Sequence, residues 1–430
     1  MDFGVEGGDE AFREEARTWL RTHLVGDFAA AARQGGPGSE HEATDVRRAW
    51  ERELGAAGWI GMGWDRTHGA YGNRAASLTQ QVVWAEEYAR AGAPGRVGHI
   101  GENLLAPTLL AYGTPAQRDR FLPPVARGEE LWCQGYSEPG AGSDLAAVRT
   151  SAVRDGGEGG DGGGTYRVTG QKIWTSLARE ADWCFVLART EAGSRRHRGL
   201  SFLLVPMDQP GRIEVRPIRQ MSGTAEFNEV FFDGALARAE HRVGEEGEGW
   251  RVAMGLLAVE RGVSTLVQQI GFAAELAEVV GLALRTGAAG ADAVLREQLV
   301  RSWAELHAMR CNALRTLGRN GDGNGRAGHG SGKGHGHAHG PGTEAEGAPS
   351  VAKLLWGGWH QRLGELAVRV RGAAGALGPY DWTPERPYAL DPLQRLFLFT
   401  RADTLYGGSD EVQRNIIAQR VLGLPKEPRA

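Results

Sequence analysis

One segment of this chain combines glycines, hydroxyl groups and a proline in a spacing that suits the binding of a phosphate. Residues 134–144 read Gln-Gly-Tyr-Ser-Glu-Pro-Gly-Ala-Gly-Ser-Asp. Gly140 and Gly142 let the backbone turn sharply and let a ligand approach the main-chain N–H groups. Successive exposed N–H groups form a concavity that suits a pyrophosphate, and Ser143 can add a hydroxyl donor. A glycine-rich surface turn is the alternative, and Gly-x-Gly alone would favour that alternative.

A second segment adds an aromatic wall and more hydroxyl groups to this signal. Residues 170–176 read Gly-Gln-Lys-Ile-Trp-Thr-Ser. The indole of Trp174 can cover one face of a flat ring, while Thr175, Ser176 and the earlier Ser137 can supply donors to the polar edges of that ring. A buried tryptophan of a β-domain is the other interpretation of Trp174. The two segments together favour a site for a flat cofactor that carries a pyrophosphate.

These two segments resemble the flavin-binding signatures of acyl-CoA dehydrogenases, and the resemblance extends from about Gly101 to Pro425, with a weaker match before it. It implies FAD as the cofactor. The residues that it assigns to FAD in the two segments are Gln134, Tyr136, Ser137, Gly142, Ser143, Trp174, Thr175 and Ser176. Tyr136 stands where the family usually has an aliphatic residue, and Ser176 stands where it usually has threonine. Neither change removes the chemistry, although Tyr136 can alter the shape of the pocket.

The resemblance also implies a reaction. In the family, a carboxylate removes the α-proton of an acyl thioester, the flavin N5 accepts the β-hydride, and hydrogen-bond donors stabilise the charge on the thioester oxygen. Family members place the carboxylate at one of two positions, and this chain has Glu260 at the first and Gly407 at the second. We therefore expect Glu260 to be the catalytic base, as in the long-chain and isovaleryl enzymes.

Glu260 lies in an otherwise apolar helical pattern, Leu-Leu-Ala-Val-Glu-Arg-Gly at residues 256–262. An apolar, water-poor pocket would raise the pKa of this carboxyl toward neutrality, as a general base requires. The residues alone leave a second interpretation open, in which Glu260 and Arg261 face solvent or pair with a neighbouring helix.

Further substrate and cofactor contacts follow from the resemblance. Substrate contacts are assigned to Ser143, Arg261, Gly407 and Gly408, with the Gly407 N–H on the thioester oxygen. Cofactor contacts across a subunit interface are assigned to Arg285, Arg369, Gly372, Ser409 and Glu411. Arg369 stands where the family usually has glutamine, and the Phe-Gly that usually follows Arg285 is missing. A flavin shared between subunits implies a homodimer or homotetramer, with a hetero-oligomer as an alternative.

The remaining pattern predicts the domains that position these residues, in an α+β multidomain fold. These are a helical N-terminal domain at 1–130, a small β-barrel at 131–245 and a C-terminal four-helix bundle at 246–430. Capping boxes start helices at Ser77 and Thr114. Short strands are expected at 166–169, 183–188, 200–205, 213–218 and 227–232. Long helices are expected at 250–285, 292–317 and 351–370, and one or two more at 391–419.

A run rich in glycine and histidine interrupts the C-terminal bundle at about 319–348. Its composition predicts a disordered insertion. Clustered histidines can bind transition metals, but a flexible glycine chain holds no fixed coordination geometry. No functional metal site is therefore expected.

Composition narrows the class of protein further. The chain has 430 residues and a formal net charge of -4, which argues against a nucleic-acid binder. Its 3 scattered cysteines indicate a reducing compartment and no disulfide framework. The acidic N-terminus lacks the features of a signal peptide, and no apolar run is expected to reach the roughly 20 residues of a membrane span. The sequence therefore predicts a cytoplasmic protein.

Three functions are compatible with these features. The first is dehydrogenation of an acyl-CoA to the trans-2-enoyl-CoA, with electrons passed to an electron-transfer flavoprotein. The second is a flavin monooxygenase or oxidase on the same fold, but such members generally lack the base, so Glu260 argues against it. The third is one subunit of a hetero-oligomeric acyl-CoA dehydrogenase, in which Trp174 and Ser143 argue against a non-catalytic role. The sequence leaves open the acyl group and the choice between CoA and an acyl-carrier thioester.

Overall fold

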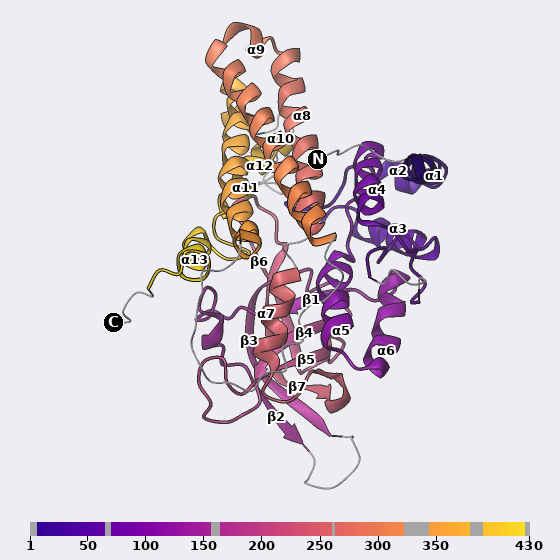
Figure 1. Ribbon diagram of the computed structural model, residues 1–430, viewed down its shortest axis with the longest axis vertical. Coiled ribbons are helices and arrows are strands. Elements are labelled where there is room, and N and C mark those ends of the chain that lie inside the picture. The colour runs from indigo at the N-terminus through magenta and orange to yellow at the C-terminus, as the bar shows by residue number, and fades with distance from the viewer. Residues whose placement is uncertain are drawn as a thin grey trace. The chain divides into compact units, whose positions relative to one another are not determined.

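The computed structural model describes residues 7–64, 70–155, 164–259, 263–321, 344–378 and 390–425. The chain divides into two compact units. The N-terminal unit is Gly4–Glu260, and the C-terminal unit is Arg261–Ala430 together with Met1–Phe3. Figure 1 labels the helices and strands of both units.

The N-terminal unit begins with helices that pack around tryptophan side chains. These helices are α1 (Gly7–His23), α2 (Asp27–Ala30), α3 (Thr44–Ala56), α4 (Leu78–Ala91), α5 (Ala106–Tyr112) and α6 (Pro115–Ala126). Ser77 and Thr114 each accept a hydrogen bond from the backbone N–H three residues ahead, so both predicted capping boxes are confirmed. The rings of Trp59 and Trp84 stack in the core of this part, with centroids 4.1 Å apart.

A mostly antiparallel sheet follows these helices. Its strands are β1 (Trp132–Gly135), β2 (Ser151–Asp155), β3 (Thr165–Ser176), β4 (Trp183–Arg189), β5 (Leu200–Pro206), β6 (Ile213–Ile218), β7 (Phe227–Arg238) and β8 (Arg242–Val243). Their order is β6-β7-β3-β2-β4-β5-β8, and β1 pairs with β4 in parallel. The predicted strands are all present, whereas β1, β2 and β8 were not predicted. β3 and β7 pair along their whole length, from Thr165 opposite Arg238 to Ser176 opposite Phe227.

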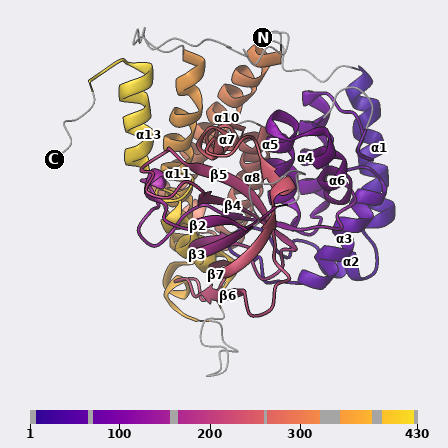
Figure 2. The same ribbon diagram turned by 90° about the horizontal axis from the view of Figure 1, so that it is seen from below.

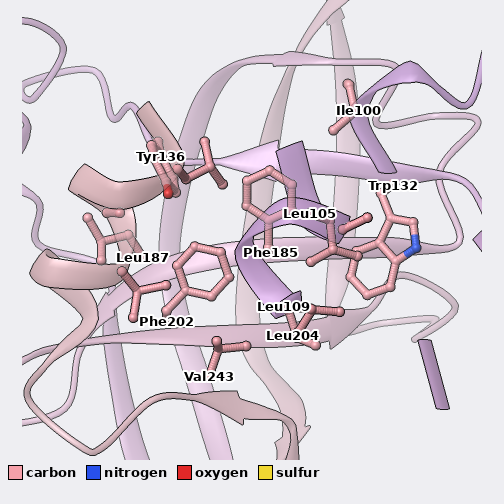
Figure 3. Close-up of a cluster of buried hydrophobic side chains, with 14 of the residues drawn as sticks. Ile100, Leu105, Leu109, Trp132, Tyr136, Phe185, Leu187, Phe202, Leu204 and Val243 are labelled. Atoms are coloured by element: carbon pink, nitrogen blue, oxygen red, sulfur yellow. The ribbon is translucent and has the colours of Figure 1, made fainter. Parts of the chain in front are cut away.

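The helices and the sheet of the N-terminal unit share one hydrophobic core. The helix α7 (Gly249–Val259) lies against β4, β5 and α5, and Figure 2 shows α1–α6 gathered on one side of the sheet. Buried side chains between these layers include Leu105, Trp132, Phe185 and Phe202 (Figure 3). This core fixes the position of β1, from which the first glycine-rich segment continues.

The C-terminal unit is a bundle of helices, as predicted. Its helices are α8 (Val263–Arg285), α9 (Ala288–Ala291), α10 (Ala293–Gly321), α11 (Glu344–Arg369), α12 (Pro392–Phe399) and α13 (Asp410–Ile416). Phe272 of α8, Leu299 of α10 and Trp359 of α11 are buried together in its core.

One prediction about a segment boundary in this region needs correction, and one stays untested. Of the helix expected at 250–285, the structure describes α7 and α8, and residues 260–262 between them lie outside the described residues, so the continuity of that helix stays a prediction. The disordered insertion expected at 319–348 has helical edges, because α10 continues past its start and α11 begins before its end. Residues 322–343 lie outside the described part, so the centre of the insertion stays a prediction.

The segment Val267–Arg285 of α8 is long and apolar enough, by length and composition alone, to cross a membrane. The sequence interpretation missed this run because Glu275 and Glu278 interrupt it. One such helix is weak evidence for a membrane span, since the core helix of a bundle passes the same test. Phe272 and Leu276 of this segment do lie in the bundle core.

Candidate functional site

The two predicted flavin segments lie next to each other at one end of the sheet. The first follows β1, and the second forms the end of β3. The Ile173 N–H donates to the Ser137 carbonyl at 2.9 Å, which joins the segments directly. Lys172 Nζ donates to the Tyr136 carbonyl at 3.0 Å and to Glu138 Oε1 at 2.8 Å. The structure therefore brings the two predicted flavin segments, residues 134–144 and 170–176, next to each other.

Lys172 and Glu138 form an ion pair that is almost fully buried, with 0% and 8% of their side chains exposed. Glu138 also accepts hydrogen bonds from the backbone N–H groups of Arg149 and Thr150, at 2.6 and 2.8 Å. Burial alone would raise the pKa of Glu138, but Lys172 and these hydrogen bonds outweigh it and lower that pKa. Losing either partner would leave an unpaired charge in the interior, so the pair fixes the spacing of the two segments.

Trp174 combines an exposed side chain with a strained backbone. Its side chain is 55% exposed, and its φ of 61° lies in the left-handed region that a residue with a side chain seldom adopts. The pairing of β3 with β7 shifts register between Lys172 and Thr175, and a bulge of this kind changes the direction of a side chain. The indole meets Phe227 edge-on, with centroids 6.1 Å apart. Exposure and strain at a large aromatic residue are typical of a binding site.

The groups around Trp174 fit a flavin that carries a pyrophosphate. A Cβ added at Gly140 or Gly142 would meet no atom within 4 Å, so the glycine turn has open space beside its backbone. The exposed indole supplies a flat wall. An open glycine turn and an aromatic wall are features that this cofactor needs.

Two of the assigned residues have side chains that do not reach this surface. Tyr136 is buried in the core against Phe185 and Phe202, with centroids 5.9 and 6.2 Å away (Figure 3). Thr175 is fully buried. For both residues, contact with a cofactor on the exposed face would come from the main chain. Among the other assigned residues, Gly142 and Ser143 are exposed, while Gln134, Ser137 and Ser176 are half-buried.

A cavity of about 760 Å³ lies between α6 and strands of the sheet in the N-terminal unit. Its lining includes Phe121 and Arg120 of α6, Thr165 at the start of β3 and Trp183 at the start of β4. Trp174 lies nine residues after Thr165, which is about 30 Å along a strand. No residue predicted for cofactor or substrate lines this cavity.

The C-terminal unit contains the predicted thioester contact in a tight turn before α13. Gly407 and Gly408 have φ values of 63° and 85°, which glycine adopts readily. Their carbonyl oxygens accept hydrogen bonds from Gln413 Nε2 at 3.3 and 3.1 Å. No hydrogen bond from the Gly407 N–H is found within the described residues. This donor is therefore available to a thioester oxygen.

The residues predicted to reach a neighbouring subunit's cofactor lie in separate parts of the C-terminal unit. Ser409 caps α13, and Glu411 lies in the first turn of that helix. Arg369 ends α11, pairs with Asp292 at 2.7 Å and is followed by the short 3-10 turn that begins at Gly372.

The structure describes Arg285, the remaining residue predicted to reach a neighbour's cofactor, but not the predicted base Glu260. Arg285 is exposed in the last turn of α8. Glu260 and Arg261 lie outside the described residues, so their assignment rests on the sequence.

Two buried charged clusters escaped the sequence interpretation. Glu138 and Lys172 both occur inside the two flavin segments, so their opposite charges were an available signal. The second cluster surrounds His360 of α11, which contacts Asp403, 43 residues away, and Glu275, 85 residues away. No local pattern links residues at such separations.

Comparison with known families decides the identity of the fold. The N-terminal, middle and C-terminal domain models of acyl-CoA dehydrogenase match residues 8–129, 133–235 and 247–422 in that order. The chain belongs to the acyl-CoA dehydrogenase family. The family consists of flavoprotein oxidoreductases of acyl-CoA metabolism, so the predicted family, the predicted fold class and the prediction of an enzyme are confirmed.

Individual relatives agree along the whole length of this acyl-CoA dehydrogenase. The chain is 54% identical to acyl-CoA dehydrogenase IpdE1 of Mycolicibacterium smegmatis, over 97% of this chain and 98% of that protein. The solved Tcur3481-Tcur3483 steroid ACAD matches it with a TM-score of 0.77 and 27% identity, over 99% of this chain and 100% of the other. The ChsE4-ChsE5 complex from Mycobacterium tuberculosis matches with a TM-score of 0.75 and 29% identity, over 99% and 100%.

Proposed function

We propose that this acyl-CoA dehydrogenase converts an acyl-CoA thioester to the trans-2-enoyl-CoA with FAD as its cofactor and Glu260 as its base. The observation that carries the proposal is the junction of the two flavin segments through Lys172 and Glu138, with the strained, exposed Trp174 beside it. When bound, FAD supplies the two-electron acceptor for the β-hydride.

The residues of this chain bind and orient the reactants. The glycine turn at Gly140–Gly142 and the hydroxyl of Ser143 bind phosphate or substrate, and Trp174 covers one face of the ring. The Gly407 N–H donates to the thioester oxygen and stabilises the negative charge that develops there when the α-proton leaves.

Glu260 removes that proton in this proposal. Its sequence surroundings are apolar, and Leu256, four residues before it in the sequence, is fully buried. Desolvation in such a setting raises the pKa of a carboxyl toward the range in which a base works at neutral pH. Gly407 occupies the alternative position for a base and has no side chain, so the two positions are complementary.

We extend the proposal to the assembly and the acyl group. The two solved structures named above each pair two different proteins, and one of them is named a steroid ACAD. Arg369 and the residues after Arg285 depart from the family pattern at positions that reach a neighbour's cofactor. These features support a hetero-oligomer with a second acyl-CoA dehydrogenase subunit, and a steroid-like, fused-ring acyl group. Transfer of electrons to an electron-transfer flavoprotein and a cytoplasmic location are further parts of this proposal.

An anaerobic titration with acyl-CoA thioesters tests the reaction and the acyl group together. The protein, purified with its partner subunit, is titrated with straight-chain and fused-ring thioesters while the oxidised flavin absorbance is followed. The proposal predicts that fused-ring thioesters bleach the flavin and that straight-chain ones do so less completely. A yellow protein that no acyl-CoA bleaches would refute it, and rapid reoxidation by O₂ with oxygenated product would point to the monooxygenase alternative. Bleaching by an acyl-carrier thioester alone would correct the choice of CoA.

A further inference from the structure

The interior of the C-terminal unit holds a chain of charged groups around His360 of α11. Only 3% of this residue is exposed. Its Nδ1 lies 2.7 Å from Asp403 Oδ2, and its Nε2 lies 2.7 Å from Glu275 Oε2 of α8. A neutral imidazole donates from only one ring nitrogen, so two carboxylates at this distance require the doubly protonated ring.

The charge state of His360 follows from these two contacts. Burial lowers its pKa, but the hydrogen bonds to Asp403 and Glu275 outweigh burial and raise the pKa to about 9. The ring of Phe272 of α8 packs against the imidazole in a tilted arrangement, with centroids 4.2 Å apart. Lys353 of α11 is also buried, and its Nζ donates to the main-chain carbonyl of Asp403.

Asp403 also contacts the turn that contains Gly407, so it connects His360 to that turn. Its Oδ1 accepts a hydrogen bond from the Tyr406 hydroxyl at 2.7 Å. Its main-chain carbonyl accepts one from Lys353 Nζ, and Lys353 Nζ also lies 4.9 Å from the centre of the Tyr406 ring. Tyr406 directly precedes Gly407, so both ends of the segment from Asp403 to Gly407 are attached to α11.

The other attachment of His360 is to α8. This helix begins at Val263, three residues after Glu260 in the sequence, and carries Glu275. The chain Glu275–His360–Asp403–Tyr406 therefore links the helix that follows the proposed base to the turn that carries the proposed thioester donor.

We infer that His360 is a positioning residue that orients the Gly407 N–H toward the thioester oxygen by holding Asp403 and Tyr406. The inference rests on the proposed function, because it needs a thioester at Gly407. Replacing His360 with glutamine removes the positive charge that both Asp403 and Glu275 contact. Tyr406 then loses its fixed acceptor, and the Gly407 N–H loses its direction.

The test compares two ligands that differ only at the thioester oxygen. Affinities for a trans-2-enoyl-CoA, the product, which keeps the thioester oxygen but does not reduce the flavin, and for the corresponding thioether, which lacks that oxygen, are measured by calorimetry on the flavin-loaded complex. Their ratio isolates the contact to the oxygen from general folding and from binding of the rest of CoA. His360→Gln and Tyr406→Phe should each reduce this ratio about tenfold, the value of one good hydrogen bond.

Arg362→Gln is the matched control, because Arg362 lies on the same helix and pairs with Glu305 at an exposed site. It should leave the ratio unchanged. In the unsubstituted protein the ratio should fall as the pH rises through about 9, where His360 loses its proton. Tyr406→Phe keeps the test decisive if His360→Gln does not fold.

The outcomes separate the inference from the function on which it rests. If the unsubstituted protein prefers the thioester and both variants keep that preference, His360 does not position the donor and only the inference is overturned. If the unsubstituted protein binds neither ligand, or binds both equally, the thioester site at Gly407 is absent and the proposed function fails with the inference.

Discussion

At Trp174 the chain keeps a backbone conformation and a side-chain exposure that folding alone disfavours. A left-handed φ costs free energy for any residue with a Cβ, and an exposed indole gains little from burial. The contact with Phe227 recovers only part of that cost. We interpret the remainder as the cost of presenting a wall to the cofactor.

Trp174→Gly should therefore separate stability from cofactor binding. Glycine accepts the left-handed conformation, which offsets the lost ring contact, so the free energy of unfolding of the flavin-free protein should change by less than about 1 kcal/mol. Flavin content after purification should fall strongly. Thermal unfolding and the flavin absorbance measure the two effects.

Arg196→Gly provides the control, because Arg196 is also an exposed residue with a left-handed φ, 56°. It should gain a similar amount of backbone stability and keep its flavin. Normal flavin content in Trp174→Gly would show that the indole does not contact the cofactor.

At the scale of elements, one buried ion pair joins the segment after β1 to the strand β3. Removing Lys172 alone leaves Glu138 charged in the interior, so Lys172→Met should lower the free energy of unfolding by about 3–5 kcal/mol. The double variant Lys172→Met with Glu138→Gln should recover most of this loss. Denaturant unfolding measures the stability, and flavin content should fall with it.

The exposed pair of Arg216 and Glu214 on β6 is the matched comparison for this experiment. Arg216→Met should leave the stability close to that of the unsubstituted protein, because solvent screens an exposed ion pair. Equal losses in Arg216→Met and Lys172→Met would contradict the structural role of the buried pair.

The charged cluster of the C-terminal unit predicts a loss of stability in alkali. The folded-state pKa of His360, about 9, is above its ordinary value of roughly 6.5. The stabilisation is therefore complete below the ordinary pKa and is lost as the pH rises through about 9. We expect the free energy of unfolding to fall by about 1–3 kcal/mol over this range, and His360→Gln to flatten the profile. An unchanged alkaline slope in the variant would exclude His360 as its source.

Local signals explain which elements were predictable. The capping boxes at Ser77 and Thr114 and the alternating strands are set by neighbouring residues, so their positions could be read directly. The short strands β1, β2 and β8 depend on partners far along the chain and gave no such signal. The direction of Tyr136 could not be predicted either, because packing against Phe185 and Phe202 decides it.

At the scale of the whole molecule, the order of the motifs was sufficient for the family and the domain types. The two flavin segments, Glu260 and the turn at Gly407 occur in one order along the chain, and matches to all the family's domain models follow the same order. The domain boundaries at 130 and 245 stay predictions. Contacts between distant residues, such as the cluster around His360, required the folded chain.

Two of the similar solved structures bear on whether this chain assembles with a second, different subunit. Similarity to two solved complexes, each of two different proteins, covers nearly the entire chain. Residues Arg285 and Arg369 lie far from the flavin segments in the sequence and are exposed. A cofactor site completed by a second subunit, as proposed above, would explain both observations.

The most direct test of the central claim follows the α-proton itself. The complex is mixed anaerobically with an acyl-CoA deuterated at the α-carbon, and release of deuterium to water is measured together with flavin bleaching. The account predicts release of one deuterium in step with bleaching, and a fall of both rates by about 10²–10⁴-fold in Glu260→Gln, with flavin content unchanged. Equal rates in Glu260→Gln, or bleaching without release of deuterium, would contradict it.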